Sequence, residues 1–232
     1  VVDVRGQRRV AICAWAMVTR AKRMRVGLAT CSALPGLDEE TQKLAAALSA
    51  RGLDASPLVW SDPTSQELKP DLVVVRSCWD YIERRSDFLV WAHSLRHVAN
   101  PAEILEWNTD KRYLLDLDKR GVPVARTRWI EPGTQWDVAE SGHWVVKPAV
   151  GIAALGAGRY DCNEAAERAL AFAHIARLQA CGATVMVQPY LHGIDQHGEI
   201  SLVFLEGRFS HAVRKRALLK GPDCGIDLRF VP

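Results

Sequence analysis

The stretch "WVVKPAVGIAALGAGRY", residues 144–160, joins an apolar strand to a loop that carries almost no side-chain functional groups. An aromatic residue and two valines are typical of a buried strand, and this one ends at Lys147 and Pro148. Residues 149–158 are all Gly, Ala, Val, Ile or Leu, with glycine at Gly151, Gly156 and Gly158. Two interpretations are open: a plain hairpin turn after a lysine, or an anion site made by the lysine and the loop backbone.

The loop does not match the common phosphate-binding motifs. No Gly-Lys-Ser/Thr follows it, which excludes a P-loop, and the dinucleotide pattern Gly-x-Gly-x-x-Gly is absent. Small side chains nevertheless let backbone N–H groups approach phosphate oxygens closely. Lys147 would add a point charge at the end of the strand.

The composition suits a globular protein with one large domain or two small ones. The chain has 232 residues, of which 48% are hydrophobic and 25% charged. The formal net charge is +3, but residues 1–23 hold six Lys or Arg and one acid, so the remainder is nearly neutral. This balance gives no global sign of nucleic-acid binding, and no apolar run reaches the roughly 18 residues of a membrane helix. We therefore expect neither a nucleic-acid nor a membrane partner, whereas the sequence leaves the oligomeric state open.

The first 23 residues have a different character from the rest. "RRVAICAWAMV" allows a signal peptide, but "TRAKR" follows at once and no small-residue cleavage site precedes a mature start. Met24 then opens a typical first strand, so we interpret residues 1–23 as a non-structural upstream extension. The six cysteines are scattered and form no Cys-x-x-Cys pair, which favours free thiols in a reducing cytoplasm.

Hydrophobic patterns predict an α/β fold in two parts. Residues 24–107 are predicted to form a small doubly wound N-terminal domain, with strands at 25–30, 55–60 and 71–77 and helices at 39–52 and 84–98. Residues 108–232 are predicted to form a second α+β domain. Its elements are a helix at 109–121 capped by Asn108 or Thr109, strands at 143–149, 159–161 and 184–191, a helix at 164–181 capped by Asn163, and a hairpin at 199–217.

Two further segments contain candidate ligand-binding residues. In doubly wound sheets ligands bind beyond the carboxyl ends of the strands, where "RSCWDY" brings together Arg76, Trp79, Asp80 and Tyr81. The alternative is that Trp79 and Tyr81 only pack under the next helix. Lys111 is predicted in the first turn of a helix, where a cation is unfavourable unless an anion lies nearby; the alternative is an exposed lysine at small cost.

The order of these features resembles the ATP-grasp superfamily, in its glutathione-synthetase-like branch. The stretches "RSCWDY", "NTDKRYLLDL", "VVKPAVG", "VQPYL" and "SLVFLEGRFSHAVRKR" are similar to bacterial ATP-grasp proteins related to the cyclo-ligase of cycloserine biosynthesis, over roughly residues 24–217. The resemblance implies that Lys111 and Lys147 contact the ATP phosphates and that the loop 151–158 covers them. It also implies that Gln188 and the amide of Tyr190 or Leu191 read the adenine edge, since Pro189 has no N–H, and that Glu199 lies near the ribose.

The same resemblance implies the reaction and its remaining parts. Arg214 and Arg216 would meet an acyl-phosphate or a substrate carboxylate, although residues two apart on a strand also suit a solvated face. Arg76, Trp79, Asp80 and Tyr81 would hold a small amino-acid-like carboxylate. The implied activity is a carboxylate–amine ligase or cyclo-ligase that uses ATP and Mg²⁺; the alternative is a non-catalytic nucleotide-binding module or an inactive fragment.

The sequence departs from the family pattern at the metal site. The family ends in an Asp/Glu–Glu–Asn magnesium site, but no asparagine occurs after Asn163. Only Glu206, Asp223 and Asp227 follow Glu199 as acids. The metal ligands therefore stay unassigned, and the sequence resembles a family member without its last portion.

Overall fold

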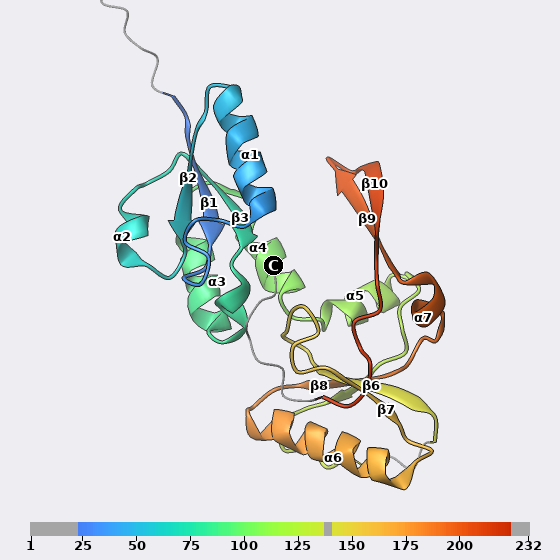
Figure 1. Cartoon of the computed structure of the whole chain (residues 1–232). Coiled ribbons are helices and arrows are strands. Elements are labelled where there is room, and N and C mark those ends of the chain that lie inside the picture. Colours follow the sequence, from blue (N-terminus) through green and yellow to red (C-terminus); the bar gives the residue numbers. More distant parts are fainter. Residues whose placement is uncertain (1–22, 137–140, 224–232) are drawn as a thin grey trace, which may run out of the picture.

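The computed structural model describes residues 23–136 and 141–223, which form two four-stranded sheets and a separate two-stranded ribbon (Figure 1). The strand orders are β2-β1-β3-β4, β5-β8-β6-β7 and β10-β9. The first sheet is parallel and the others are antiparallel, which confirms the predicted α/β class. Most of the predicted leader and the segment containing Asp227 lie outside the described residues.

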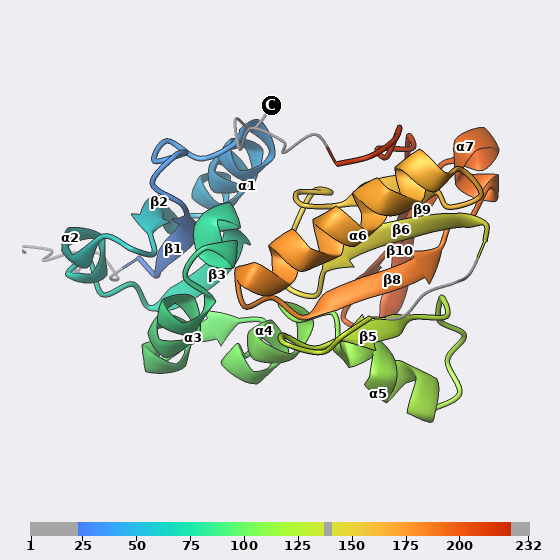
Figure 2. The ribbon, with the colours of Figure 1, turned by 90° about the horizontal axis from the view of Figure 1, so that it is seen from below.

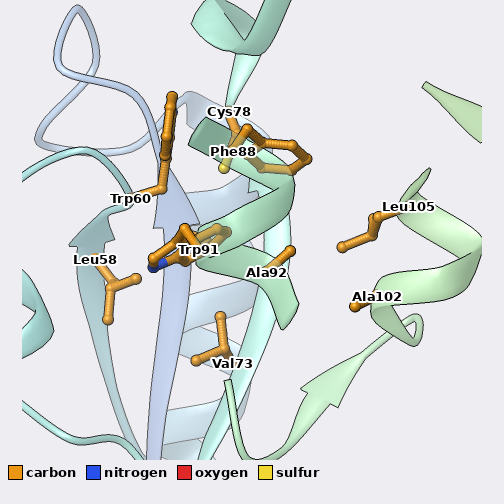
Figure 3. Packing of buried hydrophobic residues seen from close by; sticks show 10 residues of the cluster. Leu58, Trp60, Val73, Cys78, Phe88, Trp91, Ala92, Ala102 and Leu105 are labelled. Carbon is orange, nitrogen blue, oxygen red and sulfur yellow. The ribbon is translucent and has the colours of Figure 1, made fainter. Parts of the chain in front are cut away.

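The N-terminal sheet is covered by a helix on each face. Its elements are β1 (Arg25–Thr30), α1 (Glu39–Ala50), β2 (Asp54–Val59), α2 (Pro63–Gln66), β3 (Leu72–Ser77), the 3₁₀ helix η1 (Trp79–Ile82), α3 (Arg85–Ser94), β4 (Val98–Ala99) and α4 (Ala102–Asn108). Leu28 of β1 packs with Leu44 and Leu48 of α1, while its neighbour Ala29 belongs to the core under α3. Alternating side chains of one strand thus fill two separate cores. Figure 3 shows the second core, with Trp91 of α3 among the strand residues.

The C-terminal half places one long helix on one face of an antiparallel sheet. Its elements are α5 (Tyr113–Lys119), β5 (Arg128–Ile130), β6 (His143–Pro148), β7 (Gly158–Asp161), α6 (Ala165–Ala180), β8 (Val185–Pro189), α7 (Gly193–His197), β9 (Glu199–Leu205) and β10 (Arg208–Lys215). Val146 and Val187 are fully buried in a core that includes Ile175 of α6. Figure 2 shows α6 lying across β6 and β8. Since strand side chains alternate, Lys147 and Gln188 belong to the opposite face of the sheet, away from α6.

Several predicted boundaries were wrong around residues 84–121. The second helix ends at Ser94, four residues before the predicted end at residue 98, and the short parallel strand β4 begins at Val98. Residues 102–108 form α4, which was not predicted, and the next helix begins only at Tyr113. Asn108 and Thr109 do not cap that helix, because Asn108 ends α4 and the Thr109 amide donates back to Leu105.

The predicted cap of the long helix was also wrong. Glu164 occupies the N-cap position of α6, and no side chain caps it. Asn163 instead donates to Asp161 Oδ1 (2.8 Å) and accepts from the Gly142 amide (3.1 Å). The asparagine therefore fixes the β7–α6 turn against the start of β6.

The hairpin β9–β10 stands apart from both sheets (Figures 1 and 2). All eight residues of β10 are exposed. The rings of Phe204 and Phe209 pack edge to face, with their centres 5.8 Å apart. A two-stranded ribbon is marginally stable by itself. The base of the ribbon is the part relevant to the functional site, because the pair Lys215 and Glu199 lies where the ribbon meets the rest of the domain.

A buried polar network holds residues 221–223 against β7. The Asp223 amide donates to Tyr160 Oη (3.2 Å), and the same hydroxyl shares a hydrogen bond with His174 Nδ1 (2.8 Å). His174 Nε2 lies 3.4 Å from the Asp223 carboxylate, which Arg177 also contacts. Burial lowers the pKa of His174, against the opposing effect of Asp223. Asp223 is therefore committed to a structural role.

Asp38 links the start of α1 to the end of β3. Its carboxylate accepts from the Thr41 amide (2.9 Å) and hydroxyl (2.7 Å), and also from the Ser77 hydroxyl. Burial alone would raise the pKa of Asp38, but the hydrogen bonds from Ser77 and Thr41 outweigh it and lower that pKa to about 2. The charged form is thus the one that the fold stabilises.

In residues 23–136 and 141–223, no helix is both long and apolar enough to cross a membrane. Cys31, Cys78, Cys162 and Cys181 are free thiols, as predicted; Cys13 and Cys224 lie outside the described residues.

Replacing Gly158 by alanine should destabilise the fold. The added Cβ would lie 2.6 Å from the Asp223 amide nitrogen and 2.7 Å from Tyr160 Oη, so the network must shift. We expect a loss of about 1–3 kcal/mol in the free energy of unfolding, measured by urea denaturation. The matched change Gly36→Ala meets no atom within 4 Å and should cost less than about 0.5 kcal/mol. Equal effects of the two changes would contradict the packing argument.

Replacing Asp38 by alanine should lower stability in a pH-dependent way. The folded-state pKa lies below the ordinary value of about 3.9, so the carboxylate contributes fully above about pH 4 and loses its effect as the pH falls towards 2. We expect the variant to be less stable by about 1 kcal/mol at pH 7 and closer to the wild type near pH 2.5. Asp62→Ala, which removes a cap from the four-residue α2, is the control and should have a smaller effect. A pH-independent loss would refute this role of Asp38.

Candidate functional site

A cavity of about 430 Å³ lies on the face of the second sheet opposite α6. Figure 1 shows that α5 and the base of the hairpin lie on this side of the sheet. Its walls come from the connection before α5, the face of β6, the glycine loop, the end of β8 and the residues around the hairpin base. The lining includes Lys111, Ala125, Val145, Lys147, Gly151, Gln188, Tyr190, Leu191, Ile194, Glu199, Lys215 and Arg216. The volume suits a small-molecule ligand.

The structure brings Lys111 and Lys147 to the same cavity, as predicted, although 36 positions separate them in the sequence. The Lys111 ammonium donates to the carbonyl oxygens of Gly151 (2.6 Å) and Ala149 (3.3 Å). Its backbone amide also donates to Ala149 (3.0 Å), so the connection before α5 is attached to the start of the loop twice. The proposed helix-end position of Lys111 was wrong, because the residue precedes α5.

The two lysines weaken each other's positive charge. Burial and the nearby charge of Lys147 lower the pKa of Lys111 to about 8. Burial also lowers the pKa of Lys147, while Glu199 opposes that change. Among residues 23–136 and 141–223, the cavity is lined by Lys111, Lys147, Lys215 and Arg216 but by only one acid, Glu199. An anion bound there would offset a positive charge that the protein leaves largely uncompensated.

The three loop glycines have different surroundings. Gly151 lines the cavity, and its α-carbon faces the Lys111 ammonium, which a Cβ would approach to 3.8 Å. Gly156 does not line it but has φ +63°, which favours glycine. Gly158 lies in β7 and leaves room for the Asp223 backbone. Only the first glycine is placed for direct ligand contact; the other two shape the chain.

The far end of the cavity is formed by the end of β8. Gln188 donates from Nε2 to the hydroxyl of Thr127 at 2.7 Å. The Tyr190 amide donates to the His143 carbonyl oxygen (2.8 Å) and is therefore used by the protein. The other backbone amide predicted to read the adenine edge is that of Leu191. Its N–H has no acceptor among the described residues.

The side chain of Tyr190 is fixed as part of the wall. The Arg159 guanidinium lies 3.7 Å from the centre of the tyrosine ring, and the tyrosine hydroxyl donates to Asp195. Arg159 also pairs with Asp195 at 3.1 Å. These contacts tie β7 and α7 to the end of β8.

The predicted arginine pair is divided. Arg216 lines the cavity, but Arg214 lies on the exposed surface of β10 and does not. The strand ends at Lys215, so the rule that residues two apart share a side does not extend to Arg216. Lys215 was missed by the sequence reasoning; it reaches the cavity because it pairs with Glu199 at the hairpin base.

The structure places Arg76, Trp79, Asp80 and Tyr81 outside this cavity, at the carboxyl end of β3. Asp80 accepts from Trp60 Nε1 at 2.5 Å, and Tyr81 packs against Phe88 with ring centres 5.5 Å apart. Arg76 lies 3.9 Å from Glu40 of α1. Packing under the next helix therefore accounts for Tyr81, and a substrate role for these residues stays a prediction.

The described residues contain no cluster of three or more His, Cys, Asp or Glu that could hold a metal ion. In the part of the chain that the structure describes, Glu199 is the one carboxylate in the cavity lining, while Asp223 belongs to the buried network and Glu206 lies in the hairpin turn. Mg²⁺ commonly binds one or two carboxylates together with substrate phosphates and water. Glu199 is compatible with such a partial set.

The lowered pKa of Lys111 can be measured directly. We expect its amine, labelled by ¹³C reductive methylation, to titrate near pH 8 in NMR spectra, instead of near the ordinary value of about 10.4. Lys147→Met should raise this pKa, because it removes a nearby positive charge. Lys43→Met, on the exposed surface of α1, is the control and should leave it unchanged. A midpoint near pH 10 in the unmodified sequence would contradict the cavity electrostatics.

Comparison with known proteins is consistent with this geometry. Residues 26–103 match the family model described as D-cycloserine synthetase DcsG, N-terminal domain. The cycloserine biosynthesis protein DcsG of Streptomyces lavendulae is 36% identical over 201 residues, which span 81% of this chain and 65% of that protein. The chain thus spans less than two thirds of the length of this curated relative.

Solved structures extend the likeness. The crystal structure of D-cycloserine synthetase DcsG matches with a TM-score of 0.74 and 32% identity, over 85% of this chain and 70% of that one. D-alanine–D-alanine ligase from Bacillus anthracis, solved with ATP, shares the fold with a TM-score of 0.58 at 15% identity, over 85% of this chain and 67% of that one. The chain belongs to the ATP-grasp superfamily, in the group that contains D-cycloserine synthetase DcsG.

Proposed function

We propose that this chain binds ATP in the cavity beside Lys111 and Lys147 and acts in an ATP-dependent ligation of a small amino-acid-like carboxylate. One observation carries the proposal: two partly buried lysines from separate segments line one cavity together with a glycine-containing loop. Membership in the ATP-grasp superfamily and the ATP-bound relative of the same fold support it.

The electrostatics of the cavity favour a polyphosphate. Burying a cation without an anion is costly, and both Lys111 and Lys147 line the cavity, where the charge of Lys147 helps to lower the pKa of Lys111. A triphosphate would offset both charges at once. In the ligand-bound protein the Lys111 ammonium would exchange its contact with the Gly151 carbonyl for phosphate oxygens, which would free the loop to follow the ligand.

Each lining residue has a role in the proposed reaction. Lys111 and Lys147 bind the phosphates, and Gly151 offers an uncovered backbone beside them. Arg216, which lines the cavity, would neutralise negative charge that develops when a phosphoryl group moves from ATP to a carboxylate oxygen, which would give an acyl-phosphate and ADP. An amine then displaces phosphate and forms the new bond. Gln188 and the Leu191 amide hold the base.

The proposals for the metal ion and the substrate rest on fewer observations than the nucleotide site does. Glu199 would supply one oxygen to Mg²⁺, whose bound form adds charge neutralisation at the phosphates. The relatives are named for D-cycloserine synthesis and for joining D-alanine to D-alanine, which favours a small amino-acid-like substrate here. Arg76 and Asp80 remain candidates for its recognition, from the other domain.

A second candidate is a nucleotide-binding module without ligase activity. The observation that favours it is that Glu199 is the single acid among the described residues that line the cavity. Phosphoryl transfer usually requires more metal-binding oxygens than one carboxylate supplies. The two functions share the nucleotide site and differ in turnover.

Nucleotide binding is tested by thermal denaturation with ATP, with and without Mg²⁺. At 100 times the dissociation constant, ATP should raise the melting temperature by about 5–10 °C. Lys111→Ala and Lys147→Ala should each weaken binding by about ten- to a hundredfold, since each removes a charged hydrogen-bond donor. Lys43→Ala, remote on α1, is the control.

A wild-type protein that is not stabilised by ATP would refute the nucleotide site. The two functions are then separated by phosphate release in the presence of ATP, Mg²⁺ and D-alanine. Release that depends on the amino acid supports the ligase, whereas ATP binding without release supports the module.

A further inference from the structure

Thr127 and Gln188 lie directly opposite each other at the far end of the cavity. Strands β5 and β8, which lie side by side in Figure 2, pair antiparallel with Arg128 opposite Val187. The next pair in this register is Thr127 and Gln188. Opposite residues of an antiparallel pair share one face of the sheet. Their side chains meet there, with 2.7 Å between Gln188 Nε2 and Thr127 Oγ1.

The orientation of the Gln188 amide follows from the single proton of the Thr127 hydroxyl. Thr127 Oγ1 lies 2.8 Å from the carbonyl oxygen of Ala125, which can only accept. The hydroxyl therefore donates to Ala125 and has only acceptor capacity left for Gln188. The amide must turn its NH₂ group towards Thr127.

This arrangement leaves the Gln188 carbonyl oxygen for a ligand. No donor in the described residues contacts that oxygen, and it is not among the side-chain atoms that are buried without a partner. Gln188 lines the cavity, while most of its surface is buried. The cavity thus presents a fixed hydrogen-bond acceptor at the end opposite the lysines.

We propose that Thr127 is a specificity-determining residue that makes this site select purine nucleotides with a 6-amino group. The inference rests on the proposed nucleotide site and adds the reason for base choice. A 6-amino group donates to the Gln188 oxygen, whereas the 6-oxo group of hypoxanthine or guanine would face it with another acceptor. A free amide could turn over to suit either group; Thr127 prevents that turn.

The test compares the affinities of ATP and inosine triphosphate by isothermal titration calorimetry. The wild type should prefer ATP by at least about tenfold, since the wrong base leaves two acceptors facing each other. Thr127→Val removes the hydroxyl at nearly equal volume and frees the amide. We expect it to reduce the preference by at least about fivefold, with tighter inosine triphosphate binding and weaker ATP binding.

Opposite changes for the two nucleotides distinguish this role from structural damage, which would weaken both. Contacts that the protein makes to the purine nitrogen N1 are the same in the wild type and in Thr127→Val. They therefore do not contribute to the difference in nucleotide preference between the two proteins. Thr127→Ser keeps the hydroxyl and should keep the wild-type preference. An unchanged preference in Thr127→Val would overturn the inference.

A second measurement needs only the wild-type protein. Purine riboside triphosphate carries hydrogen at position 6, so it loses a hydrogen bond without adding an acceptor. Affinity should fall in the order ATP, purine riboside triphosphate, inosine triphosphate. Equal affinity of the last two, or equal affinity of ATP and inosine triphosphate, would overturn the role of Thr127 while the nucleotide site stands. Failure to bind any of the three would remove the proposed function and this inference with it.

Discussion

The contact between the Lys111 ammonium and the Gly151 carbonyl oxygen joins the two segments on which the site depends. One segment is the connection between α4 and α5, and the other is the loop that follows β6. The backbone bond from Lys111 to Ala149 fixes the same junction independently of side-chain charge. The Lys111 ammonium is held by two carbonyl oxygens and by the nearby charge of Asp110, while burial and Lys147 oppose its positive charge. An anion in the cavity would stabilise the charged form of Lys111 further.

The alternation of strand residues couples the core to the cavity. Val146 is buried under α6, and the next residue, Lys147, therefore belongs to the opposite face. The same holds for Val187 and Gln188 on β8. A slip of one residue in either strand would place a polar side chain under α6, at a cost of several kcal/mol. The hydrophobic core thus specifies which groups line the cavity.

The sequence was informative where a local rule governs the structure. The α/β class, the strand that contains Lys147 and the return strand β7 follow from periodicity and turn residues, and the structure shows them. Lys111 reached the predicted place for a different reason, since a tertiary contact and not a helix end positions it. Chain position alone could not reveal this, because the contact spans 40 residues.

Other predictions failed where strand pairing, backbone hydrogen bonding or side-chain packing determines the position of a residue. Helix α4 was missed because "AEILEWN" is short and lies between a proline and a turn. The division of Arg214 from Arg216 depends on where β10 ends, and the use of the Tyr190 amide depends on its bond to His143. Tyr81 is occupied by aromatic packing with Phe88, which composition cannot distinguish from a binding surface.

The register of β6 and β8 also determines the separation of the two ends of the cavity. Gln188 pairs with Val145, and Lys147 lies two residues further along the same strand, about 7 Å away. Both Val145 and Lys147 line the cavity, so a ligand crosses an apolar surface between the amide end and the cationic end. The nucleotide that we propose for this cavity carries its groups in the matching order, with a hydrogen-bond donor on the base at one end and negative charge on the phosphates at the other. Sulfate or phosphate alone would satisfy only the lysines, and an uncharged base only the amide, so strong binding requires both parts in one molecule.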